Sequence, residues 1–205
     1  MVIIGLTGSI GMGKSTAAAK FRSLGIGVFD ADAQVHHLYA GTAVPLIEAA
    51  FPGTTTNGIV DRVKLSAALG GRDEAFARLE AIIHPLVRAA ERAFLTAEHD
   101  KGARFAVLEV PLLYETGADK LVDGVIVVSV DAATQRARVL ARPGMTSEKF
   151  ETILARQLGD AEKRARADFV VDTTGPVTDT QAQIDQLLQK FAPRQGTAFA
   201  RVWGA

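Results

Sequence analysis

The sequence predicts an α/β fold in which helices cover a five-stranded parallel sheet. Five apolar stretches of strand length recur along the 205 residues, and the segments between them repeat apolar residues with the period of an α-helix. The stretches are apolar throughout rather than alternating with polar residues, which is typical of strands buried on both faces. Strands that alternate with helices favour parallel pairing through right-handed crossovers. The strands are expected at residues 2–6, 27–30, 105–108, 124–130 and 169–171.

Each element has its own signal. The first strand, Val2–Leu6, is short and β-branched, the second is weaker, and the fourth, Gly124–Val130, is the strongest apolar run. The last helix is expected to begin with a capping box formed by Thr178 and Gln181. Apolar residues at helical spacing occur at 76–83, 150–154 and 184–191.

Two connections between strands are too long for simple crossovers. Residues 31–104 separate the second and third strands and contain helical patterns, so we expect a helical lobe inserted into the sheet domain. A second insertion, 142–166, separates the fourth and fifth strands. The tail after Phe191 has no clear period and is expected to be loosely attached. The remaining segments form the expected sheet core: 1–30, 105–141 and 167–205.

The composition excludes several classes of protein. Lys and Arg total 23 and Asp and Glu total 23, so no global positive field favours a nucleic-acid partner. The chain contains no cysteine, which rules out disulfides, thiol nucleophiles and thiolate metal sites. The first apolar run ends at Thr7, which is too early for a signal peptide, and no later run is long enough to cross a bilayer. We expect a cytoplasmic protein, without a membrane partner, that is a monomer or a weak homo-oligomer.

Residues 8–16 have the pattern of a phosphate-binding loop. Gly8, Gly13, Lys14 and Ser15 occupy the fixed positions of G-x-x-x-x-G-K-[ST], between the first strand and a helix. Glycines let successive N–H groups face an anion, and the helix that follows directs its positive end at the phosphates. Lys14 is expected to reach the β- and γ-phosphates, and the Ser15 hydroxyl to ligate Mg²⁺. The pattern predicts a nucleotide phosphate site.

The remaining sequence narrows the class of nucleotide protein. No Asn-Lys pair is available for guanine reading, and the chain is too short for the extra modules of a motor or a transporter. A small phosphotransferase is favoured over a nucleotide-dependent switch. Asp30 and Asp32 follow the second strand, at the sheet edge where ligands gather. Asp32 is the preferred base for an acceptor hydroxyl, because Asp30 closes the strand; the alternative is that Asp32 is an N-cap.

Further motifs accompany the loop and Asp30-Ala31-Asp32: Asp61-Arg62, Leu79-Glu80, Ile83-His84-Pro85, Val110–Glu115, Arg156-Gln157, Lys163–Asp168 and Asp172–Gly175. In this order, from Met1 to Phe191, the sequence resembles the dephospho-CoA kinase family. The resemblance implies phosphorylation of the 3′-hydroxyl of dephospho-CoA, the last step of coenzyme A synthesis, with ATP and Mg²⁺. Another P-loop small-molecule or nucleoside kinase is the first alternative, and a nucleotide-dependent switch is the second.

The resemblance also implies roles for residues. Catalytic roles fall on Asp32, Lys14 and Arg142, and the insertions 31–104 and 142–166 become an acceptor-binding region and a lid. Arg136 is added to the ATP site because the basic stretch around the lid suits an anionic nucleotide. The expected ATP contacts are Gly8, Gly11, Met12, Gly13, Lys14, Ser15, Thr16 and Arg136. The expected acceptor contacts are Asp32, His84, Pro111, Leu112 and Glu115.

Some of these residues have a second interpretation. His84 precedes Pro85, which biases it toward extended backbone, so it either marks a helix start or contacts the acceptor. Glu115 is either an acceptor contact or a solvated loop residue. Thr173 stands where the family commonly has asparagine, and Gly70-Gly71-Arg72 replaces a more apolar stretch.

Overall fold

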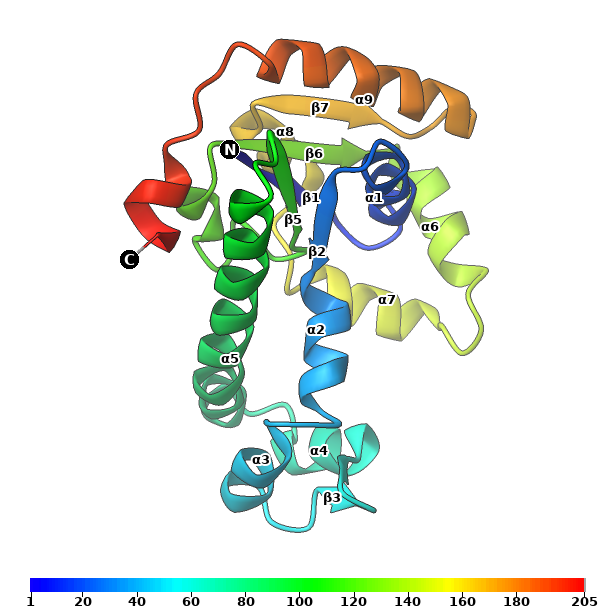
Figure 1. Ribbon diagram of the computed structural model, residues 1–205. Coiled ribbons are helices and arrows are strands. Elements are labelled where there is room, and N and C mark those ends of the chain that lie inside the picture. Colours follow the sequence, from blue (N-terminus) through cyan, green and yellow to red (C-terminus); the bar gives the residue numbers. More distant parts are fainter. Residues whose placement is uncertain (205) are drawn as a thin grey trace. The chain divides into compact units, whose positions relative to one another are not determined.

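The computed structural model describes residues 1–204; Ala205, the last position of the expected core segment 167–205, lies outside the described residues. The chain divides into two compact units (Figure 1). We call Met1–Phe29 together with Leu95–Ala205 the sheet unit, and Asp30–Phe94 the helical unit. The second boundary falls inside a long helix rather than in a loop.

The sheet unit is built on a five-stranded sheet with the order β2-β5-β1-β6-β7. The central strand β1 pairs in parallel with β5 and β6, and β6 pairs in parallel with β7. This confirms the predicted α/β fold with a five-stranded parallel sheet. The strands are β1 (Val2–Thr7), β2 (Gly27–Asp30), β5 (Phe105–Glu109), β6 (Gly124–Ser129) and β7 (Phe169–Asp172).

Helices of the sheet unit bury apolar stripes against these strands. Alternate residues of β1, from Val2 to Leu6, pack with Phe21 of α1 and with Ile184 and Phe191 of α9 in one core cluster. Figure 1 shows α9 lying along β7. The helices are α1 (Lys14–Ser23), α6 (Ala132–Leu140), α7 (Ser147–Leu154), α8 (Asp160–Arg166) and α9 (Val177–Phe191), with a 3-10 turn at Ala118–Leu121 and a π-helical turn at Phe199–Trp203.

The start of α9 differs from the prediction. The helix begins at Val177, one residue before Thr178, and Pro176 is its N-cap without a side-chain cap. Thr178 therefore lies inside the first turn, and its expected capping box with Gln181 is wrong. A proline just before the helix needs no N–H partner and fixes a backbone angle compatible with helix entry, so it replaces the cap.

The tail after Phe191 is docked, contrary to the expectation. Asp123 Oδ1 accepts hydrogen bonds from the backbone N–H groups of Thr197, at 2.7 Å, and Ala198, at 2.8 Å. Trp203 is 2% exposed, and its indole Nε1 donates to the carbonyl oxygen of Leu121 at 2.9 Å. Two anchors, one carboxylate and one indole, thus hold a segment that has no hydrophobic period.

The helical unit has its own core. Leu38, Ile47, Val60, Leu65 and Ile83 are among the buried residues that pack together there. The elements are α2 (Ala31–Leu38), α3 (Val44–Ala50), α4 (Arg62–Leu69), α5 (Asp73–Asp100) and an antiparallel pair of short strands, β3 (Thr55–Thr56) and β4 (Ile59–Val60). Residues 95–100 of α5 belong to the sheet unit.

Pro85 lies inside α5 rather than at a helix start. Proline removes the N–H that would bond the carbonyl of Ala81, a defect that costs about 3 kcal/mol in a helix interior. The 28-residue helix continues because its apolar face, which includes Leu79 and Ile83, stays packed in the core of the helical unit. His84 is therefore helical and exposed, and its interpretation as a helix start is wrong.

Candidate active site

The phosphate loop connects β1 to α1 through backbone that only glycine adopts easily. Gly11 has φ 80°, and a Cβ there would lie 2.5 Å from Cγ2 of Val139. Gly13 has φ 91° and forms the N-cap of α1, and a Cβ there would lie 3.0 Å from Oγ1 of Thr173. Both positions require glycine because side chains would be strained and would collide with the neighbouring segments.

Positive charge gathers at the start of α1. Lys14 is the first residue of the helix, and its Nζ donates to the carbonyl oxygen of Gly8 at 2.6 Å. Ser15 and Thr16 complete the first turn. This turn contains no acidic residue and no side-chain cap, so the helix dipole and its first N–H groups can act on an anion.

Thr173 supports the phosphate loop through hydrogen bonds of its side chain. Its hydroxyl donates to the carbonyl oxygen of Met12 at 2.9 Å, and it accepts a hydrogen bond from Arg138 Nη1 at 3.1 Å. Arg138 Nη2 also donates to the carbonyl oxygen of Thr173 at 2.7 Å. Met12 is 2% exposed, and its Sδ accepts from the N–H of Val130 at 3.2 Å. Sequence reasoning missed Arg138, because its contact joins residues 35 positions apart.

The peptide of Ile10 is held from two sides. Its N–H donates to Oε1 of Gln157, which follows α7, at 3.0 Å. Its carbonyl oxygen accepts from Nε2 of Gln135, on α6, at 2.7 Å. The expected lid segment 142–166 is therefore bonded to the phosphate loop through Gln157.

The segment after β5 is fixed by a buried ion pair. Nζ of Lys163, which is fully buried, lies 2.8 Å from Glu115 Oε1 and donates to the carbonyl oxygen of Pro111 at 2.9 Å. Glu115 Oε1 also accepts from the N–H of Leu158 at 2.8 Å. Glu115 is thus not a solvated loop residue. Leu112 is half-buried in the same segment.

The two arginines expected at the lid differ in their surroundings. Arg136 binds Glu151 at 2.6 Å and Ser147 at 3.1 Å, which ties α6 to α7. Arg142 is exposed in the turn between these helices, and its guanidinium has no hydrogen-bond or ion-pair partner within residues 1–204. Of the two guanidiniums, that of Arg142 is the one left without an ion-pair partner among the residues that the structure describes.

Asp32 lines a pocket of about 390 Å³ in the helical unit. Asp30, not Asp32, caps α2, because its Oδ1 accepts from the N–H of Ala33 at 2.9 Å. The N-cap interpretation of Asp32 is therefore wrong. His84 does not line this pocket. The lining residues are Asp32, Val35, His36, Tyr39, Arg62, Leu65, Ser66, Leu69, Phe76 and Leu79.

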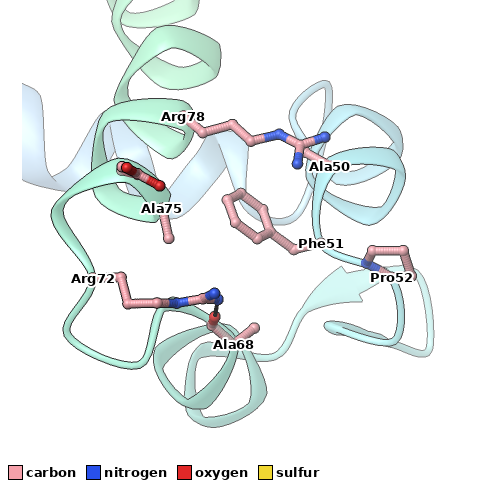
Figure 2. A pocket seen from close by; sticks show the side chains of 8 residues that line it. Ala50, Phe51, Pro52, Ala68, Arg72, Ala75 and Arg78 are labelled. Carbon is pink, nitrogen blue, oxygen red and sulfur yellow. Dashed lines mark hydrogen bonds between the residues drawn. The ribbon is translucent and has the colours of Figure 1, made fainter.

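A second pocket in the same unit, of about 440 Å³, is lined by residues of α3, α4 and α5 and of the turns that follow α3 and precede α5 (Figure 2). Gly70 and Gly71 have φ of 55° and 71°, and they turn the chain so that Arg72 Nη2 donates to the carbonyl oxygen of Ala68 at 3.0 Å. Arg78 lies over the ring of Phe51, 5.6 Å from its centroid. Figure 2 shows the two guanidiniums on either side of this ring. Asp32 is not part of this pocket.

Residues 1–204 are suited to bind Mg²⁺ only when phosphate groups supply further ligands to the ion. Residues 1–204 contain no group of three His, Asp or Glu side chains that could hold a metal ion. Mg²⁺ at phosphate sites keeps several waters and takes one or two protein ligands, so a single hydroxyl such as that of Ser15 suits it.

None of the helices formed by residues 1–204 combines the length and apolar content that a membrane crossing needs.

The comparisons with known proteins agree with one another. The profile of the family described as dephospho-CoA kinase matches residues 2–179. A dephospho-CoA kinase from Brucella melitensis is 54% identical over 198 residues, which cover 97% of this chain and 99% of the relative. Among solved structures, TT1252 from Thermus thermophilus has a TM-score of 0.80 at 33% identity and covers 92% of this chain and 97% of its own.

A dephospho-CoA kinase from Campylobacter jejuni has a TM-score of 0.69 at 26% identity, over 93% of this chain and 96% of its own. This similarity extends to the three-dimensional arrangement of the sheet and its helices. The family match over residues 2–179, together with 54% identity across nearly the whole of both chains, shows that this chain belongs to the dephospho-CoA kinase family.

Proposed function

We propose that the chain transfers the γ-phosphoryl group of ATP to the 3′-hydroxyl of dephospho-CoA, which gives coenzyme A and ADP. The observation that carries this proposal is a complete phosphate loop, with Lys14 at the start of α1, in a chain that matches the family over residues 2–179. As part of the proposal, the enzyme acts in the cytoplasm as a monomer or a weak homo-oligomer.

The donor side uses groups at the start of α1. Lys14, the loop N–H groups and the helix dipole stabilise the negative charge of the β- and γ-phosphates. The hydroxyl of Ser15 is the ligand we assign to Mg²⁺, which neutralises phosphate charge when it is bound with ATP. Thr173 and Arg138 support this role, because the Thr173 hydroxyl holds the carbonyl oxygen of Met12 in the loop and Arg138 in turn holds Thr173.

The acceptor side uses Asp32. Its carboxylate accepts a hydrogen bond from the ribose 3′-hydroxyl and takes the proton as the oxygen–phosphorus bond forms. The bond between the γ-phosphorus and the β–γ bridging oxygen breaks, and ADP leaves. The position of Asp32 on a pocket wall supports this role, since a base needs room for a substrate beside it.

The lid side uses Arg142. A guanidinium without a partner in residues 1–204 is suited to approach the γ-phosphate when the segment 142–166 closes. Closure also excludes water, which limits hydrolysis of ATP. Pro111, Leu112 and Glu115 contribute to the acceptor side by shaping the segment after β5, and His84 and Arg136 stay predictions.

The test is ADP release with Mg·ATP in the presence of dephospho-CoA, AMP, shikimate or no acceptor. We expect ADP release that depends on dephospho-CoA, and a product with a new 3′-phosphate. ADP release with a different acceptor would support the assigned ATP site but would contradict dephospho-CoA as the acceptor. Release without any acceptor would favour the nucleotide-dependent switch.

Two variants test the residue assignments. Lys14→Ala is expected to lower turnover about 100-fold or more, because one preorganised charge contact of this kind is worth that much. Asp32→Asn is expected to retain ATP binding, measured by calorimetry, and to lose transfer. Unchanged turnover in either folded variant would contradict the role that we assign to that residue.

A further inference from the structure

The pocket of Asp32 is lined by two chemically different kinds of residue. Five of the lining side chains are aliphatic or aromatic without a polar group, and the others carry polar groups. A volume of about 390 Å³ is at the lower end of the range for small-molecule sites. The apolar lining consists of Val35, Leu65, Leu69, Phe76 and Leu79, and the charged or titratable lining of Asp32, His36, Tyr39 and Arg62.

Arg62 is placed in this pocket by a helix cap. Asp61 is the N-cap of α4, and its Oδ1 accepts from the N–H groups of Val63, at 3.0 Å, and Lys64, at 3.1 Å. These backbone hydrogen bonds hold the pKa of Asp61 below its usual value, so its charge and the cap persist at neutral pH. Arg62 is the first residue of the helix that the cap fixes.

His36 connects Arg62 to the helix of the base. Asp32 and His36 are four residues apart on α2, and this spacing puts them on one face of the helix. His36 Nε2 lies 3.4 Å from Arg62 Nη1. The carboxylate of Asp32 and the guanidinium of Arg62 therefore line one pocket, and the contact of His36 with Arg62 joins α2 to α4.

No carboxylate of residues 1–204 forms an ion pair that neutralises the charge of Arg62. No ion pair engages it within residues 1–204. The oxygens of Asp61 are occupied by backbone N–H groups and by Thr56 Oγ1. Burial raises the pKa of Tyr39, and the nearby charge of Arg62 opposes that rise, so this charge acts inside the pocket. A guanidinium on a pocket wall that contacts a histidine but no carboxylate is suited to an anionic group that the pocket receives.

We propose that Arg62 binds the diphosphate of the acceptor and thereby makes the pocket selective for a nucleoside diphosphate ester over a bare nucleoside. This inference rests on the proposed function, because it takes the ribose hydroxyl to lie at Asp32. A diphosphate repels the carboxylate of Asp32, so its binding requires a cation in the same pocket. The planar fork of arginine contacts two phosphate oxygens at once, and His36 holds the guanidinium in place.

The experiment compares Arg62→Ala with the wild-type chain, using dephospho-CoA and adenosine as acceptors. We expect the KM for dephospho-CoA to rise about 10- to 100-fold, as for loss of a charge-assisted hydrogen bond. The KM for ATP and the kcat/KM for adenosine stay within about twofold of the wild-type values. Arg62→Lys restores part of the loss, because it keeps the charge without the bidentate geometry.

Arg78 provides the matched control. It is an exposed arginine of the same unit that lines the pocket of Figure 2, where it lies over Phe51. Arg78→Ala is expected to change the KM for dephospho-CoA less than about twofold, because its pocket does not contain Asp32. If Arg78→Ala raises this KM and Arg62→Ala does not, the diphosphate lies in the pocket of Figure 2 and the proposal is overturned.

The proposed function and the role of Arg62 fail in different ways. If the wild-type chain releases no ADP in response to dephospho-CoA, the proposed function fails and the inference with it. If the wild-type chain is active and Arg62→Ala keeps its KM for dephospho-CoA, only the inference fails. An equal loss of kcat/KM with dephospho-CoA and adenosine also overturns it. Thermal unfolding of both variants checks that they are folded.

Discussion

Lys163 shows what one buried charge requires of its neighbours. Its side chain is fully buried, and it is compensated by Glu115 at 2.8 Å and by the carbonyl oxygen of Pro111 at 2.9 Å. Burying an ion costs several kcal/mol, and only a close partner of opposite charge with further hydrogen bonds offsets that cost. The pair joins α8 to the segment after β5, so a local electrostatic need links two motifs that are distant in sequence.

Lys163→Met tests this pair by removing the cation and keeping the length of the side chain. We expect the free energy of unfolding in urea to fall by about 3 kcal/mol or more, because Glu115 is left without compensation. The control is Lys101, whose Nζ lies 2.7 Å from Glu98 but whose side chain is 66% exposed. Lys101→Met is expected to lose less than about 1 kcal/mol. Equal losses would contradict a special role of burial.

At the same scale, sequence patterns predict some site residues and miss others for a physical reason. The glycine pattern encodes a turn into a helix start within eight residues, so Lys14 begins α1 as expected. The brace formed by Thr173 and Arg138 depends on how α6 and β7 pack, which no local pattern contains. From the sequence, Thr173 is recognised only as a position where the family commonly has asparagine. The hydrogen bond from its hydroxyl to the carbonyl oxygen of Met12 is seen only in the structure.

Among the helices, two N-cap carboxylates contribute to how stability depends on pH. Backbone hydrogen bonds at helix starts hold the pKa values of Asp61 and Asp131 below their usual range. A carboxylate with a lowered pKa in the folded state stabilises the fold above its unfolded pKa, and this stabilisation is lost as the pH falls through the folded pKa. The loss is expected below about pH 4, where unperturbed Asp titrates.

We therefore expect Asp61→Asn with Asp131→Asn to flatten the acid side of the Tm profile below about pH 4. Asparagine keeps a cap oxygen but does not titrate. The control Asp100→Asn, at the end of α5 where no helix begins, leaves the slope unchanged. A profile of the double variant as steep as that of the wild type would show that other groups carry the acid dependence.

The ends of helices and strands can be predicted where a side chain caps the element. They cannot be predicted where tertiary packing outweighs the local signal. Asp61 and Asp131 cap helices, as short polar residues before helical patterns commonly do. Pro85 has the opposite outcome, since a proline that ordinarily ends a helix lies inside α5. Leu79 and Ile83 of α5 are buried in the core of the helical unit, and the free energy gained by this burial exceeds the cost of the one hydrogen bond lost at Pro85. This balance depends on the core and not on the sequence around Pro85.

For the whole molecule, the apolar runs of the sequence predict the sheet, but no apolar pattern predicts that the tail after Phe191 is attached to it. Trp203→Ala tests this attachment, and we expect a loss of about 3 kcal/mol or more in the free energy of unfolding, because a large buried side chain is removed. Activity stays unchanged at low temperature, since the tail packs beside Leu121 and the phosphate loop lies at the other end of β1. Arg201→Ala, an exposed neighbour, is the control, and a KM change in Trp203→Ala would contradict this separation.

Trp203 is also the only tryptophan of the chain, and this gives the protein a natural optical probe. All tryptophan emission comes from one indole that is 2% exposed and donates to Leu121. Its fluorescence is therefore that of a ring shielded from water, and it shifts to longer wavelength when the tail detaches. A fluorimeter can follow the docking of residues 192–204 without any label, while nucleotide binding at the far end of the sheet leaves the colour of the emission unchanged.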